Sequence, residues 1–383
     1  MKFFEKLYSR REFLKKLYLA LLGLGMCFFL LDRFSRRNIS TSSRKAIDLK
    51  EAMFYKKLSG NTVQCQLCFR NCIVSKGSRG FCKNRENLSG KLYSMVYAKP
   101  SAIHVDPIEK EPALHMLPGT NILCFGTAGC NFTCKFCHNW HLSQRSIEEM
   151  NYTDISPEAA VELAIKKKTP TISFTYNEPL SFYEYVYDTA KLAKDRGLKI
   201  LWHSNGSINP EPLEELLRYT DSVTIDLKGF TDKFYQDSSN AKLDPVLQTI
   251  KTIRRKGKWL ELVNLHIPTL NDNPGDVERM CSWIKDNVGS ETPLHFSRFS
   301  PSYKLTNLYP TPISTLERAY RIAKESGLDY VTIGNLPGHN NNSTFCPKCE
   351  KRIIHRMHFM VLANHVEKGR CKFCGKDIPG IWS

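Results

Sequence analysis

Cys130, Cys134 and Cys137 fall within the eight-residue stretch CNFTCKFC, which contains no fourth cysteine. A structural zinc ion and an ordinary cubane iron–sulfur cluster each take four protein ligands. Three thiolates at this spacing can bind three irons of one cubane from a single loop and leave the fourth iron open. An open position is typical of a catalytic metal site, where a substrate or cosubstrate supplies the remaining ligands. The alternative is a zinc site completed by His138 or by Cys124.

Two further cysteine pairs, Cys346 with Cys349 and Cys371 with Cys374, stand near the C-terminus and are separated by 21 residues. Two C-x-x-C turns can each present two thiolates to one tetrahedral ion. The pattern therefore predicts a zinc ribbon. Its expected role is structural, and the alternative is that it docks a partner protein. The histidines between the two pairs are not expected to be ligands.

A second group of four cysteines lies upstream with less regular spacing: Cys65, Cys68, Cys72 and Cys82. The chain has 14 cysteines, and their short spacings indicate metal ligation rather than a framework of disulfides. These four therefore predict a second metal site, which would hold zinc or an auxiliary iron–sulfur cluster. The alternative is a scatter of free thiols. If these sites bind metals, the thiols must stay reduced until the metals load.

Composition and charge limit the kinds of protein that can carry these sites. Of 383 residues, 42% are hydrophobic and 24% charged, which is typical of a globular chain long enough for one large domain with small additions. The net charge of +17 suggests nucleic acid, but the first 50 residues hold 12 of the 55 Lys and Arg against four acids and so supply +8. Metal-bound thiolates would lower the remaining +9. The sequence has no basic stripe with interleaved aromatics, which argues against nucleic-acid binding.

The N-terminus carries a targeting or membrane signal. Residues 17–31 contain no charge, a run shorter than the about 20 residues of a spanning helix but long enough for a signal core or an anchor. The preceding Ser9–Lys15 resembles the twin-arginine export signal, which handles folded, cofactor-loaded proteins. We favour a membrane-associated protein, anchored through its N-terminal segment, with its catalytic domain on the cytoplasmic side. Export by the twin-arginine route is the alternative.

The elements that would position the three-cysteine loop are predicted from about residue 118 onward. The helices begin at capping residues followed by proline, as in Ser156-Pro157, Asn209-Pro210 and Thr311-Pro312. Strands are predicted at NILCFGT, TISFTY, KILWHS, SVTIDLK, LELVNLHIP and PLHFSRF, with an edge strand at YVTIG. Strand followed by helix, six times over, predicts a parallel α/β sheet, open or closed into a partial barrel. The loop follows the first strand and so lies at the carboxyl edge, where such proteins place their chemistry.

Alternate residues of the predicted strands are polar on one face. The pattern recurs at Ser173, Thr175 and Asn177, at His203 and Asn205, at Thr224, Asp226 and Lys228, and at Asn264 and His266. The strands of a filled barrel are apolar on both faces. We therefore expect a wide barrel around a polar chamber that holds ligands; the alternative is the solvent-facing edges of a mixed sheet. His203, His266 and His295 are candidates for binding or proton transfer in the chamber.

These residues together resemble a known family. CNFTCKFC is similar to the signature of the radical S-adenosylmethionine (SAM) enzymes, in which three cysteines hold a [4Fe–4S] cluster and the amino and carboxylate groups of SAM chelate the fourth iron. The resemblance implies a partial (β/α)6 TIM-like barrel with small cysteine-rich modules at both ends. FTYNEP resembles the family's Gly-Gly-Glu-Pro element. It makes Glu178 the acid that contacts the amino group of SAM, with Tyr176 and Asn177 in place of the glycines.

The same resemblance implies further residues of the cosubstrate pocket. Phe136 resembles the aromatic residue near the adenine, while Asn205, Asp226 and Lys228 resemble pocket elements of the pyruvate formate-lyase activating branch. His266 and Asn177 are assigned to the same pocket. The combination of CQLCFRNC, PLHFSRFSPSY, YVTIGNLPGH and the C-terminal cysteine pairs is similar to the AmmeMemoRadiSam-system radical SAM enzymes. That likeness implies a Memo-type partner protein, and the radical chemistry implies a low-potential electron donor; neither indicates a substrate.

Four segments and one activity are therefore predicted. The segments are an anchor or signal with its linker, a cysteine-rich module, a radical SAM barrel and a zinc-ribbon-like module, at residues 1–50, 51–117, 118–336 and 337–383. The activity is reductive cleavage of SAM at the [4Fe–4S] cluster, giving a 5′-deoxyadenosyl radical that abstracts hydrogen from a substrate. The first alternative is an activating enzyme of a glycyl-radical protein. An alternative of another class is a non-enzymatic iron–sulfur or zinc protein for electron transfer or protein interaction.

Overall fold

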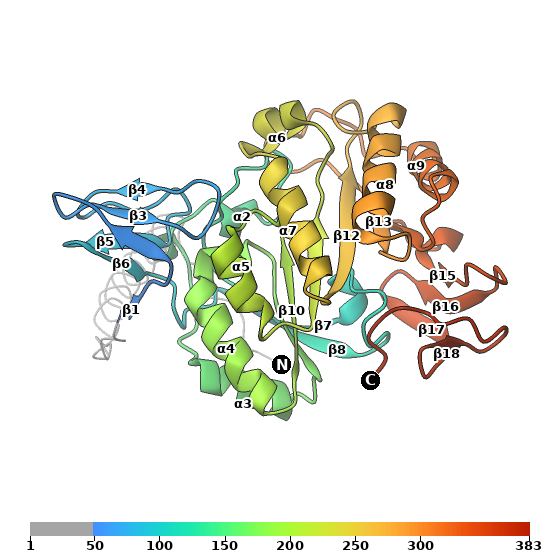
Figure 1. The fold of residues 1–383 in the computed structure, drawn as a ribbon, viewed down its shortest axis with the longest axis horizontal. Helices are drawn as coiled ribbons and strands as arrows, with labels where there is room; N and C mark the ends of the chain where they lie inside the picture. The colour runs from blue at the N-terminus through green and yellow to red at the C-terminus, as the bar shows by residue number, and fades with distance from the viewer. Residues whose placement is uncertain (1–48) are drawn as a thin grey trace, which may run out of the picture. The chain divides into compact units, whose positions relative to one another are not determined.

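The computed structural model describes residues 49–383, which are drawn in colour in Figure 1. The predicted membrane or signal segment at residues 17–31 lies outside the described residues. Among residues 49–383, no helix combines the length and the apolar character that crossing a membrane requires.

An eight-stranded sheet forms the centre of the fold (Figure 1). The seven strands from β8 to β14 run parallel and lie side by side in chain order, and β7 pairs antiparallel with β8. β7 and β14 are the two edges, so the described strands form an open, partial barrel. The predicted parallel α/β sheet is confirmed, including its edge strand, whereas β7 is absent from the prediction. The bounds are β7 Ala102–Pro107, β8 Asn121–Gly126, β9 Thr171–Phe174, β10 Lys199–Ser204, β11 Ser222–Asp226, β12 Trp259–His266, β13 Leu294–Arg298 and β14 Val331–Gly334.

Helices connect the parallel strands and cover the outer face of the sheet (Figure 1). Ser156 caps α3 as predicted, since its side chain accepts a hydrogen bond from the N–H of Ala159. Asn209 and Thr311 bond elsewhere: the Asn209 amide donates to the carbonyl of Gln66 (2.8 Å), and the Thr311 N–H donates to a carbonyl in the loop after β13. The bounds are α2 Trp140–Ser143, α3 Pro157–Lys166, α4 Tyr183–Asp195, α5 Pro210–Leu217, α6 Asp232–Ser239, α7 Asp244–Arg255, α8 Pro274–Val288 and α9 Ile313–Glu325, with short 3-10 turns η1 Ile108–Lys110, η2 Ile147–Glu149, η3 Pro179–Phe182 and η4 Asn340–Asn342.

The hydrophobic core lies between the sheet and these helices. Phe125, Phe174, Trp202 and Ile225, from four neighbouring strands, are fully buried there. Because side chains alternate along a strand, the residues next to them point to the inner face. The inner face is therefore free to carry polar groups while the outer face supplies the apolar burial that stabilises the fold.

Small sheets stand before and after the central one. The N-terminal part has two three-stranded sheets, ordered β1-β6-β5 and β2-β3-β4. The C-terminal part has the sheet β15-β16-β17 and the pair β18-β19. Their bounds are β1 Lys50–Glu51, β2 Tyr55–Lys57, β3 Val63–Cys65, β4 Ile73–Val74, β5 Arg85–Leu88, β6 Lys91–Ser94, β15 Thr344–Phe345, β16 Arg352–Met357, β17 Met360–Asn364, β18 Val366–Glu367 and β19 Arg370–Cys371.

Candidate active site

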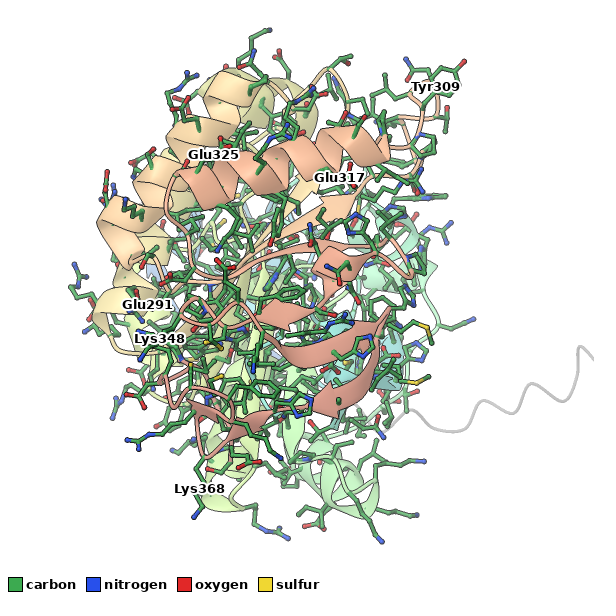
Figure 2. The ribbon with its side chains drawn as sticks, turned by 90° about the vertical axis from the view of Figure 1, so that its right-hand side faces the viewer. Glu291, Tyr309, Glu317, Glu325, Lys348 and Lys368 are labelled. Atoms are coloured by element: carbon green, nitrogen blue, oxygen red, sulfur yellow. The ribbon has the colours of Figure 1, made fainter. Side chains whose placement is uncertain are left out.

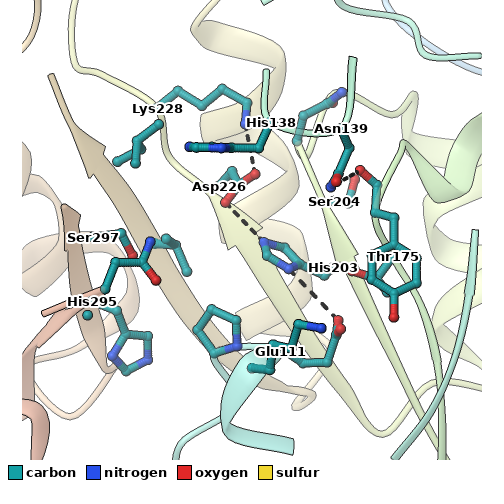
Figure 3. Close-up of a pocket in the computed structure, with 18 of the residues that line it drawn as sticks. Glu111, His138, Asn139, Thr175, His203, Ser204, Asp226, Lys228, His295 and Ser297 are labelled. Atoms are coloured by element: carbon teal, nitrogen blue, oxygen red, sulfur yellow. Dashed lines mark hydrogen bonds and ion pairs between the residues drawn. The ribbon is translucent and has the colours of Figure 1, made fainter. Parts of the chain in front are cut away.

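A cavity of about 490 Å³ opens at the carboxyl ends of the parallel strands. Side chains line it from the cysteine loop, from the ends of several strands and from the C-terminal part of the chain. Figure 3 shows Glu111, His203, Asp226, Lys228 and His295 around this space. The predicted polar chamber is therefore present on the inner face of the sheet.

The three-cysteine loop follows β8, and all three of its thiols line the cavity. The loop is held at its centre, where the N–H of Thr133 donates to the carbonyl of Ser239 (3.0 Å). Burial raises the pKa of the Cys134 thiol to about 11, although Lys228 nearby lowers it. A thiolate in this position needs a neighbouring cation, which a bound metal would supply. The donor set therefore fits a metal cluster.

The spacing of these thiols argues against a single zinc ion. Among the described residues, the only group of three or more Cys, His or acidic side chains whose ligand atoms all lie within 4.8 Å of one another is at the C-terminus. Sulfurs bound to one zinc ion are about 3.8 Å apart. His138 lines the cavity without completing so compact a group, and the Cys124 sulfur lies 3.4 Å from Glu111 Oε1. The loop is thus spaced more widely, as a cluster requires.

Glu178 follows β9 and carries a buried carboxylate that is 2% exposed. It accepts hydrogen bonds from the Asn205 N–H (2.9 Å), the Ser204 hydroxyl (2.7 Å) and the Leu180 N–H (3.2 Å). Burial raises its pKa to about 7, against the effect of these donors. The carboxylate is therefore fixed in the cavity wall, and its charge changes near neutral pH.

Tyr176 and Asn177 stand where the radical SAM family has glycines. Tyr176 adopts the left-handed backbone conformation (φ 69°) that glycine adopts freely, and its hydroxyl donates to Asp106 (2.7 Å). The Asn177 amide donates to the carbonyl of Gly129 (2.8 Å) and accepts from the N–H of Thr127 (3.0 Å). Both residues line the cavity, but the amide of Asn177 is engaged by the cysteine loop. Asn177 thus positions the loop, and a contact with the cosubstrate stays a prediction.

Asn205 and Phe136 also line the cavity as predicted. The Asn205 amide donates to Asn131 Oδ1 (2.7 Å), beside the first cysteine of the loop. The Phe136 ring stacks on Phe234, with ring centroids 6.1 Å apart and planes 27° apart. The two residues therefore form the wall on either side of the cysteines, and their roles toward the cosubstrate stay predictions.

Asp226 links Lys228 and His203 on the inner face of the sheet (Figure 3). Its carboxylate lies 2.7 Å from Lys228 Nζ and 3.0 Å from His203 Nε2, while His203 Nδ1 lies 3.9 Å from Glu111 Oε2. Although burial opposes its charge, Lys228 and His203 hold the pKa of Asp226 well below its usual range. Burial likewise lowers the pKa of His203, but Asp226 outweighs it and the pKa is raised. The site therefore presents one fixed positive and one fixed negative charge to the cavity.

His295, the third histidine candidate, reaches the cavity from β13 but has both ring nitrogens occupied. Its Nδ1 lies 2.7 Å from Thr332 Oγ1, and its Nε2 lies 2.8 Å from Glu261 Oε2. Glu261 also accepts from the N–H groups of Leu114 and His115. His295 is thus a fixed part of a buried network, which leaves His203 as the better placed histidine for proton transfer.

The prediction for β12 is wrong in its choice of face. Val263 and Leu265 line the cavity, so Asn264 and His266 point to the helical side. There the Asn264 amide donates to a backbone carbonyl, and the His266 ring packs against Phe296 with centroids 5.4 Å apart. Burial lowers the pKa of His266 to about 4, so its ring is neutral at pH 7. His266 does not line the cavity, and its position does not favour a contact with the cosubstrate.

The four C-terminal cysteines form a compact group. The sulfurs of Cys346, Cys349, Cys371 and Cys374 all lie within 4.8 Å of one another, with 3.6 Å between Cys346 and Cys374 and 3.8 Å between Cys349 and Cys371. These distances match the about 3.8 Å expected around one tetrahedral ion. The predicted ribbon can therefore hold a metal ion.

The hairpin between β16 and β17 brings two residues that the sequence analysis does not assign to the site. His358 and Phe359, at its turn, line the main cavity. Figure 2 faces the C-terminal sheet, which lies beside α9, with Lys348 and Lys368 on exposed turns. The ribbon is thus part of the cavity wall. An aromatic residue at a hairpin turn is the only sequence signal of this role, and it is a weak one.

Arg356 fixes this hairpin to the central sheet. Its guanidinium is buried and donates to the carbonyl of Leu114 (2.6 Å) and to Thr344 Oγ1 (2.8 Å). It also lies 3.6 Å from Glu109, whose carboxylate is equally buried. Because of burial, the pKa of Glu109 is raised and that of Arg356 is lowered. The C-terminal part is therefore joined to the floor of the cavity by a buried ion pair.

The four upstream cysteines come together as well. Cys65, Cys68, Cys72 and Cys82 line one small enclosed cavity behind the cysteine loop. Asn131, the residue after Cys130, lies in its wall. The structure thus brings together each of the three groups of cysteines that the sequence singles out.

Comparisons with solved structures return similar radical SAM folds. A domain of pyruvate formate-lyase-activating enzyme from Bacteroides vulgatus has a TM-score of 0.38 and 17% identity, over 43% of this chain and 98% of that chain. SuiB of Streptococcus suis bound to S-adenosylmethionine has a TM-score of 0.44 and 12% identity, over 54% of this chain and 48% of that chain.

An open α/β barrel with three thiols and a buried acid around one cavity is the architecture of an enzyme that binds a metal cluster at the carboxyl edge of its sheet. The profile of the Radical SAM superfamily matches residues 125–284. The uncharacterized protein MJ0808 of Methanocaldococcus jannaschii is 46% identical over 332 residues, or 86% of this chain and 99% of that protein. Pyruvate formate-lyase 1-activating enzyme of Escherichia coli is 23% identical over 226 residues, or 55% of this chain and 91% of that enzyme. The chain belongs to the radical SAM superfamily and is a radical SAM enzyme.

Proposed function

We propose that this enzyme cleaves SAM reductively at a [4Fe–4S] cluster held by Cys130, Cys134 and Cys137, and acts on a substrate in the same cavity. The observation that carries the proposal is that these three thiols share one cavity with Glu178 and with the Asp226–Lys228 pair. Three thiols with wide spacing suit a cluster that keeps one iron open for a cosubstrate.

When bound, the cluster and SAM supply a 5′-deoxyadenosyl radical that takes a hydrogen atom from a substrate carbon. The chain's own residues bind, orient and shield the reactants. Glu178 accepts N–H groups from the cosubstrate side, while Asp226 and Lys228 keep fixed charges beside the cysteine loop. The enclosing walls exclude water, which would otherwise compete for the hydrogen bonds of the site.

Metal and partner assignments follow from the same features. We propose zinc as the ion of the C-terminal ribbon, because four thiolates at tetrahedral spacing are the ligand set that zinc prefers. A low-potential one-electron donor is the required redox partner. A Memo-type protein is the proposed further partner, on the likeness of the quoted motifs to the AmmeMemoRadiSam system.

Activation of a glycyl-radical protein is the second candidate. The observation that favours it is the match to an enzyme whose name states that it activates pyruvate formate-lyase. Under this hypothesis the cavity would admit a glycine-bearing loop of a partner protein. A stable glycyl radical in a co-incubated protein, detected by electron paramagnetic resonance (EPR), would favour this candidate over a small-molecule substrate.

The test of the main proposal is EPR of the anaerobically reconstituted, reduced protein with and without SAM, combined with an assay of 5′-deoxyadenosine. We expect a cubane signal that changes on addition of SAM, and nucleoside product from the unmutated protein alone. Cys134→Ala is the comparison variant, and Cys281→Ala is the matched control because its thiol is buried in α8, outside the three cysteine groups. A loaded, reduced protein that neither changes its signal nor forms product would overturn the proposal.

A further inference from the structure

We propose that Cys65, Cys68, Cys72 and Cys82 bind a second, fully ligated [4Fe–4S] cluster that relays electrons to the cysteine loop of the active site. The relay role rests on the proposed function, whereas the cluster assignment rests on geometry alone. The competing occupants of this site are a zinc ion and four free thiols.

All four thiols converge on one place although they come from separate turns. Cys65 ends β3, Cys68 and Cys72 lie in the turn before β4, and Cys82 precedes β5. Backbone hydrogen bonds fix the turn, with the N–H of Cys65 donating to the carbonyl of Cys72 (2.9 Å). The same enclosed cavity touches all four. The arrangement is therefore a built site of four soft ligands.

The chain contains its own standard for the size of this site. The ribbon sulfurs all lie within 4.8 Å of one another, which matches the spacing around a single ion. Within residues 49–383, neither the upstream quartet nor the active-site triad forms a group that compact. Thiolates on a cubane stand roughly 6 Å apart, because each binds a different iron. The quartet thus shares the spacing class of the triad and differs from that of the ribbon.

Charge at the site also favours a cluster. Four thiolates around a cubane leave a net charge of about −2 in the oxidised state. Arg85 lies with Nη1 3.6 Å from the sulfur of Cys65, is 2% exposed and is paired with Glu184. The side chain of Arg70 lines the same cavity. Two guanidinium groups therefore stand against a dense group of thiolates, and N–H donors to cluster ligands are a known means of adjusting reduction potential.

The quartet is separated from the active-site loop by a single layer of residues. The Arg70 Nε donates to the carbonyl of Asn131 (2.6 Å), and the Asn84 amide donates to the carbonyl of Ala128 (2.5 Å). Gly129 has a left-handed backbone (φ 82°), and a Cβ there would overlap the carbonyl oxygen of Cys82. The loop that carries the triad thus leans directly on the segment that carries the quartet, so the two clusters would be neighbours.

Full ligation and enclosure define what such a cluster can do. Four protein thiolates leave no open iron, so the second cluster does not bind substrate. A reduced ferredoxin- or flavodoxin-class donor gives up one electron, and the second cluster passes from its 2+ to its 1+ state. It returns to 2+ as the same electron moves to the cluster at the triad. No bond forms or breaks in this relay.

The assignment is tested by metal analysis and Mössbauer spectroscopy of the anaerobically reconstituted full-length protein. We expect about eight iron atoms and about one zinc per chain. The triple variant Cys130→Ala/Cys134→Ala/Cys137→Ala leaves the quartet intact and should keep about four irons, with an EPR signal that SAM does not change. About four irons and about two zinc ions in the unmutated protein, or no iron in the triple variant, would overturn the second cluster.

The quartet variant Cys68→Ala/Cys72→Ala supplies the reverse result. It should keep about four irons, the ribbon zinc and the response to SAM. Retained zinc shows that the variant has folded. If the triple variant keeps its cluster but the unmutated protein never responds to SAM, the proposed function fails while the second cluster stands.

The relay is tested by comparing two reductants, dithionite and reduced flavodoxin. In the quartet variant, the ratio of flavodoxin-driven to dithionite-driven 5′-deoxyadenosine formation should fall by about tenfold relative to the unmutated protein. Cys281→Ala should leave the ratio unchanged. An equal fall with both reductants would contradict the relay.

Discussion

Asn177 Nδ2 lies 2.8 Å from the carbonyl oxygen of Gly129, so a side chain at the end of β9 holds the loop that follows β8. A second bond, from the N–H of Thr127 to Asn177 Oδ1, closes the contact from the other side. One amide therefore fixes the start of the three-cysteine loop.

Asn177→Ala should lower iron occupancy at the triad. Each lost hydrogen bond costs about 1 kcal/mol, and the loop carbonyl is left without its donor. Iron per chain, measured against the ribbon zinc in the same sample, checks this. Asn287→Ala is the control, because the exposed amide of Asn287 bonds only within its own helix. Equal iron-to-zinc ratios in the two variants would contradict the role of Asn177.

Glu178 makes the stability of the apoprotein depend on pH. Burial raises its pKa to about 7 in the folded chain, from an ordinary value of 4.5. The folded state therefore binds more protons than the unfolded state between these values, and stability falls as pH rises through this window. Relative to the unmutated apoprotein, Glu178→Gln should gain thermal stability at pH 8 compared with pH 5.

Thermal denaturation of both apoproteins at several pH values measures that difference. A difference in Tm between Glu178→Gln and the unmutated chain that stays constant from pH 5 to pH 8 would rule out the raised pKa. The comparison cancels the thiols, since their titration is common to both proteins.

Removal of the ribbon metal should loosen the cavity wall. Cys349→Ser/Cys371→Ser breaks the compact group, so the hairpin turn with His358 and Phe359 loses its support. Hydrogen exchange should increase in β16 and β17, while β8 to β11 keep their protection. Mass spectrometry with and without a zinc chelator measures this. Unchanged exchange in the hairpin of the metal-free protein would show that the ribbon holds its shape without the ion.

Arg356→Met should destabilise the fold by about 3–5 kcal/mol, because it leaves the buried carboxylate of Glu109 without its partner. The double variant Arg356→Met/Glu109→Gln should recover part of this loss, since both charges are then removed. Urea denaturation of the four proteins of this cycle gives the coupling free energy. Additive losses would show that the ion pair does not join the hairpin to the sheet.

The sequence predicts the parallel strands well because each is a short β-rich run with clear turn and cap signals on either side. β7 escapes prediction because it is an edge strand in which His104 and Asp106 interrupt the apolar residues. In β12 the alternation is visible, but it does not say which set faces inward. Asn264 is polar yet satisfied by a carbonyl on the helical side, which only the packed structure shows.

The candidate site is predictable where its ligands are close together in the sequence. The three-cysteine loop and the ribbon pairs are of this kind. His358 and Phe359 are not, because the hairpin reaches the cavity through the buried contact of Arg356 with a segment more than two hundred residues away. Likewise the spacing of the upstream thiols depends on three-dimensional turns that their sequence intervals do not define.

Gly129 has a consequence for biogenesis. The loop that carries the triad can settle only against the segment around Cys82, since the two backbones meet there without room for a side chain. That segment comes earlier in the chain and so leaves the ribosome first. The early part of the protein therefore acts as an internal template for the later part, and cofactor insertion has to wait until that template has folded.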